Sequence, residues 1–133
     1  MATWSARAIN IGPIAFAGQV RGHHHVYDVP NAEGGDDVAP MPPEALLSAL
    51  GSCMGMVVAL VCQARDISYE GMHVQVEADV NEDENRLENF RMTIHMPEKL
   101  SDKQRRAVEN AEALCKVRNT LLAATEVQVE IAD

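Results

Sequence analysis

Residues 45–62, ALLSALGSCMGMVVALVC, are 18 consecutive positions without a charged side chain, in a chain whose net charge is −9. A run of this length reaches the threshold at which a membrane-spanning helix is considered. This run holds two glycines, two serines and two cysteines, and it lacks the aromatic belts and flanking Lys/Arg clusters typical of membrane helices. We therefore expect a helix buried in protein and no membrane partner.

A helix that is apolar on every side must be covered on every side. The chain has 133 residues, enough for a single domain over residues 1–133 with a sizeable core. In a domain of this size one sheet covers only one side of such a helix. The other side must meet another subunit, so the first structural inference is an obligate homodimer.

Charge and cysteine content narrow the classes of function. Twenty acidic against eleven basic residues argue against nucleic-acid binding, which needs Lys/Arg patches. The opening sequence MATWSARAINIGP has no charged segment followed by an apolar run, so we expect no secretory signal. Three cysteines do not make a disulfide framework, and we expect a cytoplasmic protein with reduced thiols.

Hydrophobic periodicity predicts an α+β domain. In the first part of the chain we expect strands within 3–28 with a turn at 10–13, then a Pro- and Gly-rich loop over 29–43 and a long helix from near Pro43. Next we expect a hairpin of two strands around NEDEN at 81–85. A helix opened by the capping box SDKQ at 101–104, a helical turn at 120–125 and a last strand complete the expected order.

Alternation along the strands predicts which side chains face the core. The inward residues of the hairpin are expected to be Met72, Val74, Val76, Ala78, Val80, Phe90, Met92, Ile94 and Met96. The helix after residue 101 is expected to bury Ala107, Val108, Ala111, Leu114 and Cys115. The last strand is expected to turn Val127, Val129 and Ile131 inward.

The three cysteines do not have equivalent positions. Cys53 and Cys62 are nine residues apart, which places them on opposite sides of one helix. Cys53 and Cys115 each lie on the apolar face of their own helix, so both can point into the same space. Two interpretations stay open: a reactive pair, or inert thiols of the kind common in protein cores.

Free cysteines in protein cores are mostly inert, but the neighbours of these two thiols are compatible with a reactive pair. Gly51, Ser52 and Gly55 leave room for a substrate beside Cys53, and Lys116 and Arg118 supply cations that favour a thiolate near Cys115.

Metal binding is not expected. His23 and His25 could lie on one strand face as ligands, but no carboxylate or cysteine stands at ligand spacing, so exposed edge side chains are the favoured interpretation. The sequence also lacks a C-x-x-C motif. We expect neither a metal site nor a bound cofactor.

Three segments together resemble the OsmC/Ohr family: HHHVYDVPNAEGGDDVAPMPPE (23–44), PPEALLSALGSCMGMVVALV (42–61) and AEALCKVRNTL (111–121). They are similar to a D-x-P…GG…G-x-x-P-x-E-L loop, a small-residue helix carrying a cysteine, and a late C-P-V-x-N-T-L segment. The resemblance implies the OsmC-like fold, an intertwined homodimer whose long central helices pack against antiparallel sheets.

The resemblance also implies a thiol-dependent peroxidase that reduces organic hydroperoxides in oxidative-stress defence. By matching motif, Cys53 is the peroxidatic thiol, Cys115 the resolving thiol, and Glu44 the residue that helps hold an arginine against the thiolate. The implied partners are an apolar organic hydroperoxide and a thiol reductant, of the dihydrolipoyl type or a small thiol. A sulfenic acid formed on one cysteine must be captured by a second thiol before it oxidises irreversibly.

The sequence departs from the peroxidase pattern at three points. The turn NIGP at 10–13 lacks the arginine of that branch, and neither Arg7 nor Arg21 lies in a matching motif. Lys116 stands where the pattern has proline. The spacing from Glu44 to the helix cysteine is one residue shorter than in the peroxidases. The sequence is therefore closer to the broad OsmC-like branch.

The alternative function is a non-catalytic OsmC-like protein that binds a small apolar ligand at the dimer interface. In that case Cys53 and Cys115 are core residues. A guanidinium within hydrogen-bonding reach of Cys53 favours the enzyme, and its absence favours the binding protein.

Overall fold

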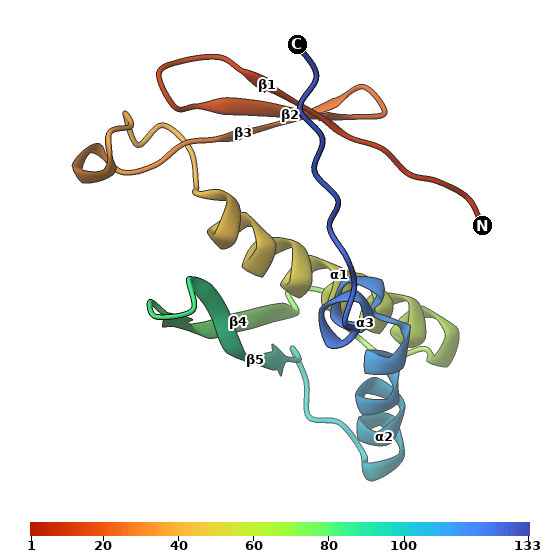
Figure 1. Ribbon diagram of the computed structural model, residues 1–133. Helices are drawn as coiled ribbons and strands as arrows, with labels where there is room; N and C mark the ends of the chain where they lie inside the picture. The colour runs from red at the N-terminus through yellow and green to blue at the C-terminus, as the bar shows by residue number, and fades with distance from the viewer. The chain divides into compact units, whose positions relative to one another are not determined.

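The computed structural model describes residues 1–133, which divide into two compact units, Met1–Leu46 and Leu47–Asp133. The elements in chain order are β1 (Arg7–Asn10), β2 (Phe16–Val20), β3 (His23–Tyr27), the short 3-10 helix η1 (Asn31–Glu33), α1 (Pro42–Arg65), β4 (His73–Asn81), β5 (Arg86–His95), α2 (Asp102–Asn110), the 3-10 helix η2 (Ala111–Leu114) and α3 (Lys116–Leu122) (Figure 1). The predicted α+β class is confirmed. That residues 1–133 form one domain stays a prediction.

The first unit contains a three-stranded antiparallel sheet in the order β1-β2-β3. β2 and β3 are joined by the two-residue turn Arg21-Gly22, in which both residues have positive φ (49° and 85°). This conformation matches the twist of the flanking strands. The predicted turn after β1 is closed by Asn10, whose side-chain amide donates to the carbonyl of Gly12 at 2.7 Å.

The loop after β3 is organised by the carboxylate of Asp28, which is buried. One carboxylate oxygen accepts the backbone N–H groups of Asp36 (3.1 Å) and Val38 (3.3 Å). Backbone N–H donors, first that of Val29, hold the pKa of Asp28 below its usual range. A side chain at Gly35 would overlap the Val29 carbonyl, so the close chain approach here requires glycine.

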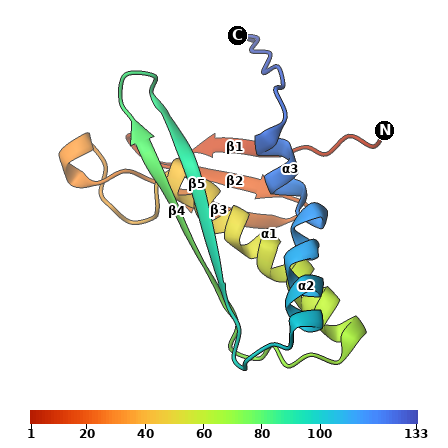
Figure 2. The same cartoon turned by 90° about the horizontal axis from the view of Figure 1, so that it is seen from below.

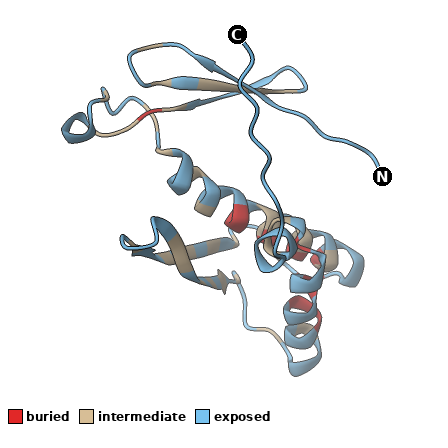
Figure 3. Ribbon diagram, viewed as in Figure 1, coloured by how far each residue is buried: buried red, intermediate tan, exposed pale blue.

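The second unit is built on α1, along which the β4–β5 hairpin runs (Figure 2). Gly51 faces Val76 of β4 so closely that an added methyl group would meet the valine side chain. The buried residues gather on α1 and α2 and in the segments that follow each helix (Figure 3). The core cluster comprises Leu50, Met54, Val58, Cys62, Ile67, Val108, Ala111 and Cys115.

The hairpin keeps the predicted alternation except at its far end. Along β4, Val74, Val76 and Ala78 are half-buried, but Val80 is 64 % exposed. A bulge lies between the pairs Glu77–Arg91 and Asp79–Glu88, where Asn89 has a φ of 56°. The extra residue lies in β5, and pairing resumes beyond it, where Val80 pairs with Leu87. Val80 is nevertheless exposed, against the prediction that it faces the core.

The predicted capping box opens α2. Ser101 Oγ accepts the N–H of Gln104 at 3.1 Å, and the side chain of Gln104 accepts the N–H of Ser101 at 2.9 Å. The α-helix ends at Asn110 and continues as the tighter η2, which changes the rotation per residue. Leu114 is therefore 63 % exposed, against the prediction that it joins the core. The helical turn predicted at 120–125 is displaced toward the N-terminus, as α3.

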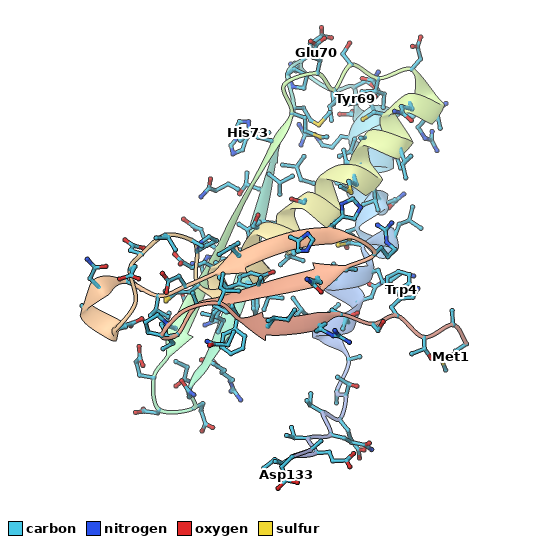
Figure 4. The ribbon with its side chains drawn as sticks, turned by 90° about the horizontal axis from the view of Figure 1, so that it is seen from above. Met1, Trp4, Tyr69, Glu70, His73 and Asp133 are labelled. Atoms are coloured by element: carbon cyan, nitrogen blue, oxygen red, sulfur yellow. The ribbon has the colours of Figure 1, made fainter.

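The last strand predicted from the sequence does not form in the single chain. Val127, Val129 and Ile131 are 86, 86 and 91 % exposed. The extended C-terminal segment ends at Asp133, well away from α1 (Figure 4). A strand needs a neighbouring strand for its backbone hydrogen bonds, and residues 124–133 have none here.

The long uncharged run forms α1 as predicted, but the chain itself covers little of it. α1 is long and apolar enough to cross a membrane, with a mean hydropathy of 2.2 over its most apolar 18 residues. The buried core helix of a protein can have the same length and hydropathy, so these two properties do not identify a membrane helix. Only 28 % of this apolar window is buried. Met56 and Leu60 are 68 and 62 % exposed, which leaves one side of the helix without a partner in the chain.

Asp28 is expected to make the stability of the protein sensitive to acid. Because its pKa is lowered in the folded state, its contribution is present above the unfolded value, about 3.9, and is lost as pH falls through the lowered value. Asp28→Asn should therefore unfold at a lower urea concentration than the wild type at pH 7. The difference should shrink as the pH falls below about 4 and through the lowered pKa of Asp28.

Asp36→Asn is the matched control, because that side chain is exposed and only its backbone N–H meets Asp28. Equal urea midpoints for Asp28→Asn and the wild type at pH 7 would contradict the role given to this carboxylate.

Candidate active site

Cys53 lies on α1 at the border of the core. Its side chain is half-buried and packs against the core cluster, whereas its neighbour Met54 is 2 % exposed. The fully buried stripe of α1 runs through Leu50, Met54, Val58 and Cys62, which recur every four residues. Cys53 is off this stripe and is only half-buried.

Cys115 is a single extended residue between two helical segments. With φ −78° and ψ 101° it ends η2 and precedes α3, and its side chain is fully buried. As the N-cap of α3, its thiol makes no capping hydrogen bond to α3. The first N–H groups of a helix have no partner within the helix and therefore seek an acceptor elsewhere.

The N–H groups at the start of α3 act on the sulfur of Cys53. The backbone N–H of Val117 is the largest cause of the lowered pKa of Cys53, and the Cys115 thiol and the backbone N–H and positive charge of Lys116 act in the same direction. Burial opposes them. These groups favour the thiolate, the reactive form of a cysteine.

The pKa of Cys115 moves the other way. Burial raises it first, and the hydrogen bond to Cys53 and the charge on that residue raise it further, against the backbone N–H groups of Arg118 and Val117, which lower it. Cys115 therefore keeps its proton and donates it toward Cys53. Cys53 and Cys115 thus lie against one core, and the groups around them favour the thiolate of Cys53 and the protonated form of Cys115. That the two thiols form a reactive pair stays a prediction.

The third thiol has no such partners. Cys62 is fully buried in the core stripe, and burial alone raises its pKa. Its surroundings are those of an inert core cysteine.

Glu44 lies in the first turn of α1, in the first unit, and is exposed. Its carboxylate accepts the N–H of Met41 at 2.9 Å, which caps the start of the helix. Its predicted action on an arginine beside Cys53 stays a prediction. Among residues 47–133, no arginine contributes to the lowered pKa of Cys53.

The histidines form no metal cluster. His23 and His25 are exposed on β3, and His24 lies 3.2 Å from the side chain of Gln19. Residues 1–133 contain no group of three or more His, Cys, Asp or Glu side chains placed to hold a metal ion. His73 and His95 stack across the hairpin with ring centroids 4.5 Å apart; His73 lies beside the connection that carries Tyr69 and Glu70 (Figure 4).

Sequence reasoning missed the backbone donors of the site. It assigned Lys116 as a source of charge and did not predict that α3 begins there, so the N–H groups of Lys116 and Val117 were not candidates. α3 begins at Lys116 because Cys115 is extended, and no residue in AEALCKVRN is a glycine or proline that would predict this break between helices.

Comparison with known proteins identifies the family. The OsmC-like protein family matches residues 34–130. No curated protein matches the sequence.

Solved structures share the fold. One, from Psychrobacter arcticus, is described as an osmotic stress induced and detoxification response protein (TM-score 0.79, 19 % identity, covering 90 % of this chain and 89 % of that one). Another is an OsmC-like protein from Mycoplasma pneumoniae (TM-score 0.71, 19 % identity, covering 91 % of this chain and 88 % of that one). A third is the organic hydroperoxide resistance protein OhrB of Bacillus subtilis (TM-score 0.60, 17 % identity, covering 90 % of this chain and 92 % of that one). The family match spans most of the chain and the fold agrees, so the predicted resemblance is confirmed and this chain belongs to the OsmC-like protein family.

Proposed function

We propose that this protein is a thiol-dependent peroxidase that reduces organic hydroperoxides, with Cys53 as the attacking thiol and Cys115 as the resolving thiol. One observation carries the proposal: two adjacent thiols in one core have pKa values moved in opposite directions, down for Cys53 and up for Cys115. Similar structures from Bacillus subtilis and Legionella pneumophila are described as organic hydroperoxide resistance proteins, which supports this choice of substrate.

The proposed reaction has three balanced steps. The Cys53 thiolate attacks the terminal peroxide oxygen, the O–O bond breaks, and the products are a Cys53 sulfenic acid and, after protonation, an alcohol. The Cys115 sulfur then attacks the sulfur of the Cys53 sulfenic acid and displaces its hydroxyl group, which departs as water. The product is a Cys53–Cys115 disulfide. A dithiol reductant supplies two electrons and two protons to restore both thiols, and is itself oxidised to a disulfide.

The surroundings of Cys53 favour an apolar peroxide over hydrogen peroxide. Half-buried Val57, Val61 and Val117 pack against the same core as the thiol, and they offer methyl groups and no side-chain hydrogen-bond donor. Apolar side chains of this kind stabilise an alkyl or aryl group by removing it from water.

The working form in this proposal is a homodimer located in the cytoplasm. The 28 % burial of the apolar window of α1 supports a second subunit, because an apolar helix side that stays in water is unfavourable. The three free cysteines support a reducing compartment.

The binding-protein alternative is favoured by one observation, the lack of an arginine among the groups that stabilise the Cys53 thiolate within residues 47–133. The N–H groups of α3 and the charge of Lys116 answer it in part, because they favour the same ionised form. Turnover decides between the two functions.

Cys53→Ser should abolish the consumption of cumene hydroperoxide in the presence of dihydrolipoamide, because a serine hydroxyl stays protonated and does not attack the O–O bond. Cys62→Ser should keep most of the activity, because that thiol belongs to the core stripe and has no contact assigned to the reaction. Peroxide consumption at matched protein concentration is the measurement.

Intact-mass spectrometry provides the control for this experiment. One equivalent of hydroperoxide should remove two hydrogens from the wild type, whereas Cys115→Ser should gain oxygen, because its sulfenic acid lacks a resolving thiol and goes on to sulfinic acid in excess peroxide. A wild type that keeps its reduced mass and consumes no peroxide would establish the binding-protein alternative.

Lys116→Met should slow the alkylation of Cys53 at pH 7 by about two- to five-fold, the effect expected of one nearby charge at a partly exposed site. Methionine keeps the backbone N–H and a similar length, so the change isolates the charge. Iodoacetamide labelling with peptide mapping measures it. Lys103→Met is the matched control, since Lys103 lies on α2 and does not act on Cys53. An equal fall in the alkylation rate in both variants would contradict the role given to the Lys116 charge.

The dimer is expected to persist at low micromolar concentration and to dissociate only with unfolding, because its separation returns the apolar side of α1 to water. Sedimentation velocity across a dilution series measures this. A compact, stably folded monomer in that range would show that α1 needs no second subunit.

A further inference from the structure

The segment that follows Cys115 is tied back across that residue by a small hydrogen-bond network. The side-chain amide of Asn119 donates to the carbonyl of Ala113 at 3.1 Å, and so joins α3 to η2. Its backbone N–H donates to the carbonyl of Cys115 at 2.9 Å. Arg118 donates to the Asn119 side-chain oxygen at 3.3 Å and lies 3.8 Å from the carboxylate of Glu112.

This network matters because the backbone alone does not fix α3. Cys115 is extended, so the regular hydrogen bonds of η2 and α3 do not run continuously through it. An isolated helix of seven residues is not stable in water. The direction in which α3 points its first N–H groups therefore depends on contacts that span the break, and the amide of Asn119 supplies the hydrogen bond that does so.

We propose that Asn119 is a positioning residue for Cys53: its bond to Ala113 holds α3 so that the N–H groups of Lys116 and Val117 point at the Cys53 sulfur. The inference rests on the proposed function only in taking Cys53 as the reacting thiol. Asn119 does not touch the substrate in this proposal, and it acts through the two backbone donors.

The neighbouring residue offers a matched contrast. Thr120 donates from its hydroxyl to the carbonyl of Lys116 at 2.8 Å, a bond that stays inside α3. Thr120 and Asn119 are both exposed, so both can be substituted without opening the core. Removing the Thr120 bond tests the integrity of α3, and removing the Asn119 bond tests its attachment to η2.

The experiment is the pH profile of Cys53 alkylation by iodoacetamide, resolved by peptide mapping. In Asn119→Ala the midpoint of the profile should move to higher pH and the rate at pH 7 should fall about two- to five-fold, as expected for misaligned helix N–H donors. Alanine favours the helix, so α3 keeps its propensity. Asn119→Ser, a second truncation that is too short to reach Ala113, should give the same shift. Thr120→Val should keep the wild-type midpoint.

Loosening of the structure by itself changes the plateau rate at high pH, which reports access to the thiol, and leaves the midpoint in place. A wild-type midpoint in both Asn119 variants would overturn the proposal. An equal shift in Thr120→Val would also overturn it, because general stability of α3 would then explain the effect.

Alkylation needs no peroxide, so this test is separate from that of the proposed function. A shifted midpoint in Asn119→Ala together with a wild type that consumes no peroxide supports the positioning role and contradicts the peroxidase. A wild type that consumes peroxide together with an unshifted midpoint in Asn119→Ala supports the peroxidase and contradicts the positioning role.

Discussion

The packing of α1 against the helical break at Cys115 is the contact on which the candidate site depends. The buried stripe of α1 meets Val108, Ala111 and Cys115 in one core. Because Met54 is fixed in this stripe, the preceding residue, Cys53, is held at its edge, where it is half-buried and the N–H groups at the start of α3 act on its sulfur. Apolar burial thus sets the geometry, and the polar contacts of the thiol follow from it.

The departure of this chain from the family pattern at Lys116 has a physical consequence. A proline there has no N–H and no charge, whereas lysine supplies both, and both lower the pKa of Cys53. The groups that favour the thiolate therefore come from the segment that also carries Cys115. In the proposed reaction, any movement of that segment to form the disulfide also withdraws these groups from Cys53, at the point where a thiolate is no longer needed.

Periodicity and local signals in the sequence predicted α1, the hairpin and the capping box, because each depends on neighbouring residues alone. The errors have a different origin. Leu114 follows a change from α to 3-10 geometry, which shifts the phase of a pattern that is read as continuous. Val80 lies at the far end of the hairpin, beyond a bulge in β5, where the chain leaves it exposed. The strand over 127–131 needs a pairing partner, which a sequence pattern does not provide. The apolar faces placed Cys53 and Cys115 in one space, but the N–H donors around them depend on the backbone at Cys115.

The asymmetry between the two thiols also orders the proposed chemistry. Cys115 is fully buried and keeps its proton, so a peroxide meets Cys53 first. After burial, the hydrogen bond to Cys53 and the charge on that residue are what raise the pKa of Cys115. Conversion of the Cys53 thiolate to a neutral sulfenic acid removes that charge. The pKa of Cys115 then falls toward the value set by burial and by the N–H groups of Arg118 and Val117, which favour its ionised form. The first oxidation thus promotes ionisation of the thiol that has to complete the disulfide.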